Sequence, residues 1–240
     1  MSGHSKWSTI KRKKEKTDSQ RAKIFTKIGR ELAVAVRQGG GADQNFNVRL
    51  RDCIIKAKSN NVPNENIERI IKKAAVDSAG DNYEDIVYEG YGPSGVAVIV
   101  KTLTDNRNRT AADLRHYFDK YGGKMGSPGC VSFLFEEKGL LVLEKKNFNP
   151  DKLFEDCVNI GADDLLEEKD YFEISTKPDD FLKVKEGLEN LNYNFDYAEI
   201  SMVPSTYVEL LDENKTTKMQ KLLDALEDNN DVQIVWHNWK

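Results

Sequence analysis

Apolar residues recur every three or four positions in three stretches near the N-terminus, the spacing of helices with one buried face. Between Lys16 and Arg37, at about 100° per residue, the apolar side comprises Ile24, Phe25, Ile28, Leu32 and Val36. The opposite side is a stripe of cations comprising Lys16, Lys23, Lys27, Arg30 and Arg37. The pattern predicts an amphipathic helix with a core-facing front and a positively charged back.

Two shorter helices are predicted to follow. The glycines at 39–41 end the first helix, because glycine adopts the left-handed conformations that helix ends need. Pro63 separates the next two, since it disfavours helical geometry in the preceding residue and suits a following first turn. Their apolar sets are Leu50, Cys53, Ile54 and Ala57, then Ile67, Ile70, Ile71 and Ala74. Three facing apolar stripes predict a small helical bundle.

After about residue 79 the chain changes to β-branched and aromatic runs that are typical of strands. A hairpin around the turn GYGPSG is predicted from 83–91 and 96–103, followed by a helix at 109–121. CVSFLFE and LLVLE, separated by EEKG, are interpreted as a second hairpin. The elements predicted after Pro150 are helix 151–160, strand 165–174, helix 178–191 and strand 195–203.

The count of elements predicts that one α/β unit interrupts another. The first hairpin and its helix lack partners, which the C-terminal tail supplies as TYVELL, a helix at 217–226 and a strand at 232–236. We therefore expect an α+β protein with an N-terminal three-helix bundle and two α/β domains, one inserted in the other. The predicted domains are 1–79, then 80–131 with 205–240, and the inserted, acidic 132–204.

Charge is distributed unevenly along the 240 residues. Residues 1–76 hold 18 Lys and Arg against 7 Asp and Glu, whereas the rest of the chain holds 18 against 33. A segment with a formal charge of +11 favours contact with a polyanion such as nucleic acid over a merely solvated helix face. No run approaches the about 20 apolar residues of a membrane span, and the start lacks the apolar stretch of a signal peptide. We expect a soluble, cytoplasmic protein with no membrane partner.

Catalytic and cofactor chemistry find little support in the sequence. GYGPSG at 90–95 matches G-x-G-x-x-G formally, but a strand follows where a dinucleotide site requires a helix. The histidines and cysteines lack metal-ligand spacing; they are His4, His116, His237, Cys53, Cys130 and Cys157. A nuclease using the acidic pairs at 163–164 and 167–168 is the weakest hypothesis. We predict no enzyme, no cofactor and no metal site.

Two polar loops are candidate binding elements. TDNRNRT at 104–110 places Arg107 and Arg109 at the start of a predicted helix, where unpaired N–H groups and the helix dipole attract anions. Capping of that helix by Asp105, Asn106 or Asn108 is an equally good interpretation. GSPGCVSF at 126–133 is either a bend between domains or a glycine-rich loop that admits close backbone approach to a ligand.

The N-terminal arm carries further candidates for nucleic-acid contact. Lys6, Lys11, Arg12, Lys13 and Lys14 are suited to phosphates, each releasing counterions on binding. Trp7 is suited to stacking on an unpaired base, although packing on the bundle is the more favoured interpretation.

Four separated motifs occur in order along the chain: GHSKWSTIKRKKEKTDSQRAKIFTK, NNVPNENIERIIKKA, YEGYGPSGVAVIV, and TDNRNRT followed by GSPGCVSFLF. With these motifs the sequence resembles the YebC/PmpR family over essentially its full length. The resemblance implies ferredoxin-like character for both α/β domains.

The resemblance also implies a function. The family is assigned as probable DNA-binding transcriptional regulators, so we expect a non-enzymatic DNA-binding regulator of transcription. The alternative is a ribosome-associated, RNA-binding translation factor, because relatives are linked to translational activation and to stalled ribosomes. The partner is DNA, or ribosomal RNA and the ribosome in the alternative; neither sequence nor resemblance fixes the oligomeric state.

Overall fold

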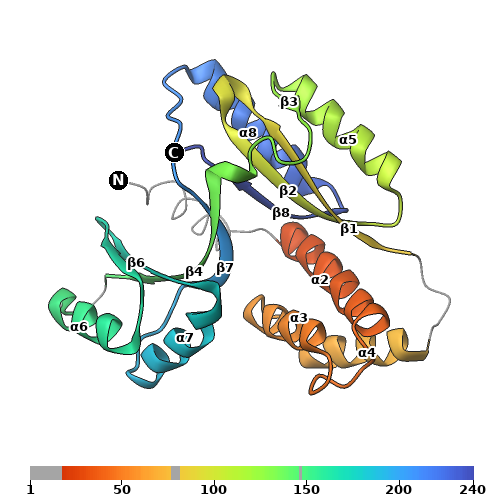
Figure 1. The fold of residues 1–240 in the computed structure, drawn as a ribbon. Coiled ribbons are helices and arrows are strands. Elements are labelled where there is room, and N and C mark those ends of the chain that lie inside the picture. Colours follow the sequence, from red (N-terminus) through yellow and green to blue (C-terminus); the bar gives the residue numbers. More distant parts are fainter. Residues whose placement is uncertain (1–17, 77–81, 146–147) are drawn as a thin grey trace.

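The computed structural model describes residues 18–76, 82–145 and 148–240. The predicted N-terminal helices are present as α2 (Asp18–Gln38), α3 (Val48–Ser59) and α4 (Asn64–Val76). Both α3 and α4 pack on α2, as Figure 1 shows. The predicted apolar stripes form their core, in which Ile28, Leu32, Leu50 and Ile67 are at most 4% exposed.

The turn that ends α2 is fixed by a buried amide. Asn47 caps α3 by accepting from the Leu50 N–H, and its Nδ2 donates to the carbonyls of Ala35 at 2.8 Å and Gly41 at 2.7 Å. A Cβ on Gly39 would collide with the Asn47 side chain, and Gly41 has a φ of 104°. Glycine is therefore required at both positions, by close approach at one and by backbone conformation at the other.

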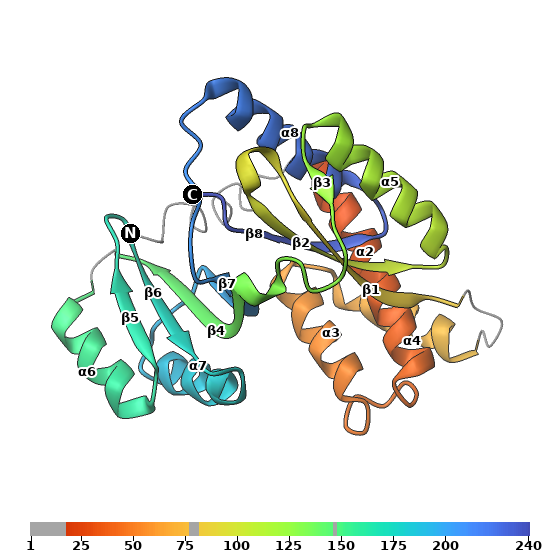
Figure 2. The ribbon, with the colours of Figure 1, turned by 45° about the horizontal axis from the view of Figure 1, so that its top comes forward.

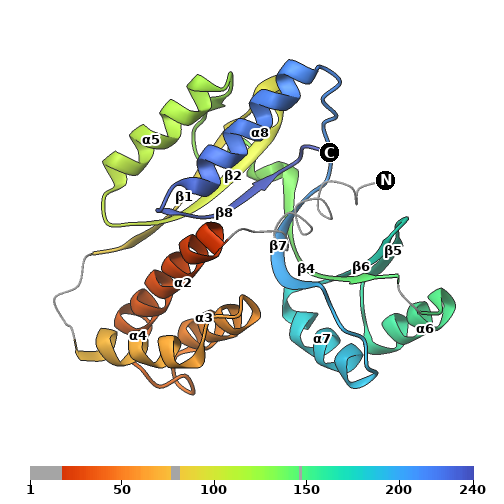
Figure 3. The same ribbon diagram turned by 180° about the vertical axis from the view of Figure 1, so that it is seen from behind.

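The first sheet combines strands from residues 84–125 with one strand close to the C-terminus. Its order is β3-β1-β2-β8, and all neighbours are antiparallel. Helices α5 and α8 cover one face (Figure 3), and the core between them includes Val98, Leu114, Phe118 and Leu222. The elements are β1 (Glu84–Tyr91), β2 (Ala97–Thr104), α5 (Arg107–Lys120), β3 (Lys124–Met125), α8 (Glu213–Asp228) and β8 (Val232–His237). The hairpin around GYGPSG is confirmed, its turn forming the short 3-10 helix Pro93–Gly95.

The second sheet is made entirely from the stretch between β3 and α8. Its order is β5-β6-β4-β7, all antiparallel, with α6 and α7 on one face (Figure 2). The elements are β4 (Phe135–Glu144), α6 (Pro150–Ile160), β5 (Asp164–Glu167), β6 (Tyr171–Thr176), α7 (Phe181–Asn190) and β7 (Tyr197–Pro204). The expected α+β class is confirmed, while the domain boundaries at 79, 131 and 204 stay a prediction.

The second predicted hairpin is wrong in position. EEKG is not a turn but lies inside the continuous strand β4, and the hairpin instead joins β5 to β6, within the stretch predicted as one strand at 165–174. The prediction assigned Gly139 to a turn, but this glycine lies in a strand where the side chains of Thr176 and Phe181 come close to the backbone. A Cβ added at Gly139 would collide with both. The true turn is closed by the Glu168 N–H, which donates to the Tyr171 carbonyl at 3.0 Å.

TYVELL is not a strand either. Within it, Val208 forms only an isolated parallel bridge with Trp239. The sheet edge is occupied instead by β3, two residues paired with Gly90 and Tyr91. A strand this short leaves no periodic signal in the sequence.

The helical bundle lies against the first sheet. Gln38 Nε2 donates to the Tyr83 carbonyl at 2.8 Å, and Arg49 forms an ion pair with Asp85 at 2.7 Å. In Figure 3 the N-terminal part of α2 lies beside the turn between α8 and β8. The cationic back of α2 therefore meets the end of α8.

Candidate nucleic-acid interface

The predicted contact residues fall into three groups. Those of the arm lie outside the described residues: Lys6, Trp7, Lys11, Arg12, Lys13, Lys14 and Lys16. A second group, Lys23, Lys27, Arg30 and Arg37, lies on α2, and the third, Arg107 and Arg109, lies in the first turn of α5.

Three of the α2 cations contact the C-terminal end of α8. Lys23 Nζ lies 2.8 Å from Asp228 Oδ1, and Lys27 Nζ donates to the Glu227 carbonyl at 2.7 Å. Arg30 Nη1 donates to the Asn230 carbonyl and to Asp231 Oδ1, each at 3.0 Å. The end of a helix carries partial negative charge on its unpaired carbonyls. The stripe thus meets an anionic surface supplied by the chain itself.

Asp231 is the centre of this contact. Its side chain is 7% exposed. Oδ2 accepts hydrogen bonds from Arg109 Nη2 at 2.8 Å, from the Thr110 hydroxyl at 2.8 Å and from the Thr104 hydroxyl at 3.2 Å. Its other oxygen binds Arg30, so a single carboxylate joins α2 to β2 and α5.

Both interpretations of the loop at 104–110 have a structural counterpart. Asn106 caps α5, its side chain accepting from the Arg109 N–H at 3.0 Å. The anions at the start of α5 are carboxylates of the protein itself, because Arg109 pairs with Asp231 and with Asp105. Arg107 lies on the surface of the same turn with an exposed side chain.

A further set of cations remains exposed on the outer helices of the bundle. It consists of Arg51, Lys58, Arg69, Lys72 and Lys73. The sequence carries a signal for the α4 members, Arg69, Lys72 and Lys73, because they alternate with the apolar stripe of that helix. We call these five residues the α3–α4 cations.

The loop at 126–133 is organised by a buried carboxylate. Glu89, 6% exposed, accepts hydrogen bonds from the backbone N–H groups of Gly129, Val131 and Ser132, all at 2.8 Å. The Tyr91 hydroxyl donates to the Cys130 carbonyl at 2.8 Å. This frame presents Phe133 to solvent with 72% of its surface exposed. Nothing in the sequence pattern indicated that Glu89 holds the loop.

The two buried carboxylates, Asp231 and Glu89, predict that the folded protein loses stability in acid. Burial alone raises the pKa of Asp231, but hydrogen bonds from Arg109 and Thr110 outweigh it and hold the pKa below its usual value. For Glu89, burial is likewise outweighed by the N–H groups of Val131, Gly129 and Ser132, which lower the pKa.

A carboxyl with a lowered pKa binds its proton more weakly in the folded than in the unfolded state, so protonation favours unfolding. The free energy of unfolding should stay level at neutral pH and fall as the pH drops below about 5, where the unfolded carboxyls begin to protonate. Urea unfolding between pH 3 and pH 7 measures this, and the Asp231→Asn variant should show a weaker dependence. An equal pH dependence in both proteins would contradict the assignment to Asp231.

Two further properties of the described parts of the chain concern metal binding and thiol reactivity. Among those residues, no group of three or more His, Cys, Asp or Glu side chains is arranged to hold a metal ion. Burial raises the pKa of Cys53 to about 11, with a contribution from Glu31, so its thiol stays protonated at neutral pH. No helix among the same residues is long and apolar enough to cross a membrane.

These features define a class: a multidomain α+β protein with a basic helical bundle docked on the first of two helix-covered antiparallel sheets. Residues 5–77 match the TACO1/YebC protein N-terminal domain, and residues 83–239 match the TACO1/YebC second and third domain. The chain belongs to the TACO1/YebC family, which confirms the resemblance stated above.

Relatives in sequence and in structure align with all or nearly all of the chain. A "probable transcriptional regulatory protein" of Acetivibrio thermocellus is 56% identical over 100% of this chain and 99% of its own. One of the same name from Persephonella marina is 52% identical over 100% of this chain and 96% of its own. The crystal structure of a conserved hypothetical protein from Aquifex aeolicus aligns with a TM-score of 0.79 at 45% identity, covering 94% of this chain and 92% of that one.

Proposed function

We propose that this protein is a non-enzymatic, cytoplasmic regulator that binds nucleic acid, with DNA as its target in transcription. The observation that carries the proposal is the set of exposed α3–α4 cations on a bundle that belongs to the +11 segment. The names of the relatives, probable transcriptional regulatory proteins, support the regulatory role.

The proposed interface differs from the stripe along α2. Lys23, Lys27 and Arg30 already have partners at the end of α8, so a phosphate would have to displace those partners first. We therefore assign phosphate contacts to the α3–α4 cations and to the basic residues of the N-terminal arm. Arg107 is exposed and joins this set, and Arg37 is exposed on the last turn of α2. Arg109 is assigned to the Asp231 cluster instead.

A second candidate function is a translation factor that binds ribosomal RNA. Phe133, exposed on its ordered loop, favours this candidate. RNA-binding proteins stack aromatic side chains on unpaired bases, whereas a DNA duplex offers none. Sedimentation with ribosomes at low salt tests this directly; absence from the ribosomal fraction together with crosslinks only to DNA would reject it.

Salt dependence tests the phosphate contacts. For a duplex, the slope of log affinity against log salt should fall by about 0.9 for each contact removed. Lys72→Glu with Lys73→Glu should therefore flatten the slope by about 2 and weaken binding regardless of sequence. Fluorescence anisotropy with a labelled duplex and a labelled RNA hairpin over a series of KCl concentrations measures this.

The matched control is Lys152→Glu with Lys183→Glu, which reverses two exposed lysines of α6 and α7. It makes the same change in net charge but lies outside the bundle. Equal losses in the two double variants, or binding that does not depend on salt, would contradict the proposed interface.

A further inference from the structure

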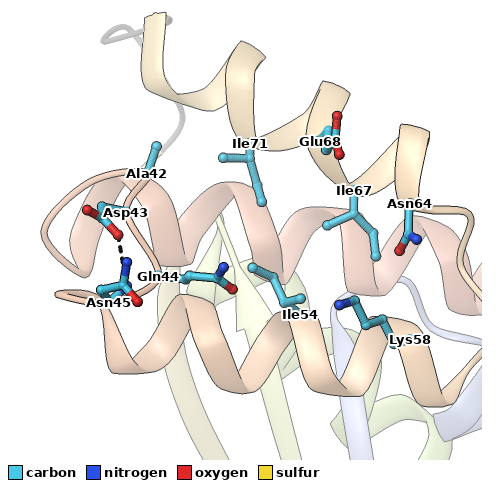
Figure 4. A pocket seen from close by; sticks show the side chains of 10 residues that line it. All are labelled: Ala42, Asp43, Gln44, Asn45, Ile54, Lys58, Asn64, Ile67, Glu68 and Ile71. Carbon is cyan, nitrogen blue, oxygen red and sulfur yellow. Dashed lines mark hydrogen bonds between the residues drawn. The ribbon is translucent and has the colours of Figure 1, made fainter.

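A groove of about 500 Å³ opens on the bundle between α3, α4 and the loop at 42–45. Its floor is apolar, formed by Ile54 from α3 and by Ile67 and Ile71 from α4, which point toward one another in Figure 4. Ile67 is 4% exposed, so the floor is continuous with the bundle core. This volume falls within the range of small-molecule sites.

The rim of the groove is polar. Gln44 and Asn45 come from the loop, Asn64 from the first turn of α4, and Lys58 from the last turn of α3. In Figure 4 the Gln44 amide and the Lys58 amine extend toward the floor from opposite ends. The remaining rim groups are two carboxylates, Asp43 and Glu68; Asp43 also accepts from the Asn45 N–H at 2.9 Å.

This combination selects against several occupants. The loop at 42–45 crosses one end of the groove, so a helix cannot run through it. Two carboxylates repel a phosphate placed on the floor. A flat, uncharged group with N–H donors fits instead, since its faces contact isoleucine side chains while its edge meets amides and carboxylates.

We propose that this groove receives an unpaired nucleobase of the bound nucleic acid, with guanine preferred. Guanine presents two neighbouring N–H donors on its Watson–Crick edge, which a carboxylate accepts together, and its carbonyl oxygen accepts from an amide or from Lys58. Phosphates on either side of the base meet the α3–α4 cations, which stand on the same two helices. The inference rests on the nucleic-acid binding in the proposed function, and it concerns a single-stranded target, because a duplex offers no unpaired base.

The test uses the full chain with ¹³C-labelled isoleucine methyl groups. Three probes are titrated: an RNA hexamer with one guanosine among uridines, the same hexamer with an abasic ribose at that position, and its DNA counterpart. The guanosine hexamer should shift the methyl signals of Ile54, Ile67 and Ile71 and bind at least about fivefold more tightly than the abasic one. Ile174, in the core of the second sheet, should not shift. The DNA hexamer reports whether the ribose matters, and shifts with either sugar support the groove.

Glu68→Gln should remove most of the guanosine preference and leave binding of the abasic hexamer intact or slightly stronger. Glu65→Gln, one turn earlier on α4 and outside the groove, should leave that preference unchanged. Equal affinity for guanosine and abasic hexamers without methyl shifts would overturn the groove while leaving nucleic-acid binding in place. Failure of all three hexamers, of duplex DNA and of the RNA hairpin to bind would overturn the proposed function, and the groove with it.

Discussion

Replacing Asp231 by asparagine should lower the free energy of unfolding by about 3 kcal/mol. The carboxylate is buried and accepts from Arg30, Arg109, Thr104 and Thr110. The neutral amide removes the anion from Arg30, leaves Arg109 with Asp105 alone and places a donor where an acceptor is needed. Urea unfolding at pH 7 measures the change through the midpoint at constant slope.

Asp228→Asn is the matched control. Its side chain is 65% exposed and pairs with Lys23, itself 42% exposed. An exposed ion pair contributes at most about 1 kcal/mol, so this variant should unfold close to the parent. If the two variants were equally stable, the Asp231 contacts would add nothing measurable to the hold of the bundle on the first sheet.

The second large effect is expected at Glu89. Glu89→Ala leaves three backbone N–H groups without an acceptor and removes a buried hydrogen-bonded charge, so the free energy of unfolding should fall by about 2–3 kcal/mol. The loop at 126–133 should also lose order, because its N–H groups at Gly129, Val131 and Ser132 share this single side chain. Hydrogen exchange at those three amides reports the loop separately from global unfolding.

Glu137→Ala, an exposed position on β4, is the control for Glu89. It should change neither the unfolding midpoint nor the exchange of the loop amides. Unchanged exchange at Gly129 and Val131 in Glu89→Ala would mean that the loop is ordered by its glycine geometry alone.

Local pattern predicted most of the secondary structure. The bundle was predictable because its apolar residues recur every three or four positions, which places them on one face of a helix. The first hairpin was predictable because the turn GYGPSG separates two β-branched runs. The second hairpin was misplaced because glycine serves two purposes. In the sequence alone, Gly139 inside a strand looks the same as a glycine in a turn.

The candidate site was less predictable, for a physical reason. The α2 stripe was identified correctly as a row of cations, but which anion faces it depends on residues about two hundred positions away, such as Asp228 and Asp231. A helical period carries no information on such pairings. Glu89 likewise acts on amides some forty positions later, and an isolated glutamate in a strand gives no sign of that role.

The two sheets are joined by two chain segments rather than one. The chain leaves the first sheet before β4 and returns after β7, and the two crossings are tied where the Ser205 N–H and hydroxyl both donate to the Leu134 carbonyl at 2.9 Å. Beside this tie the sheets also pack on each other: Ala97 and Ile99 of β2 form a buried apolar cluster with Val131 and Phe135, and the Trp236 indole N–H donates to the Ser201 hydroxyl at 3.1 Å. The two sheets are therefore held together by side-chain packing as well as by the two chain segments, and this restricts their relative rotation. A ligand that bridges the two sheets meets surfaces whose relative twist is already set, which reduces the orientational entropy lost on binding.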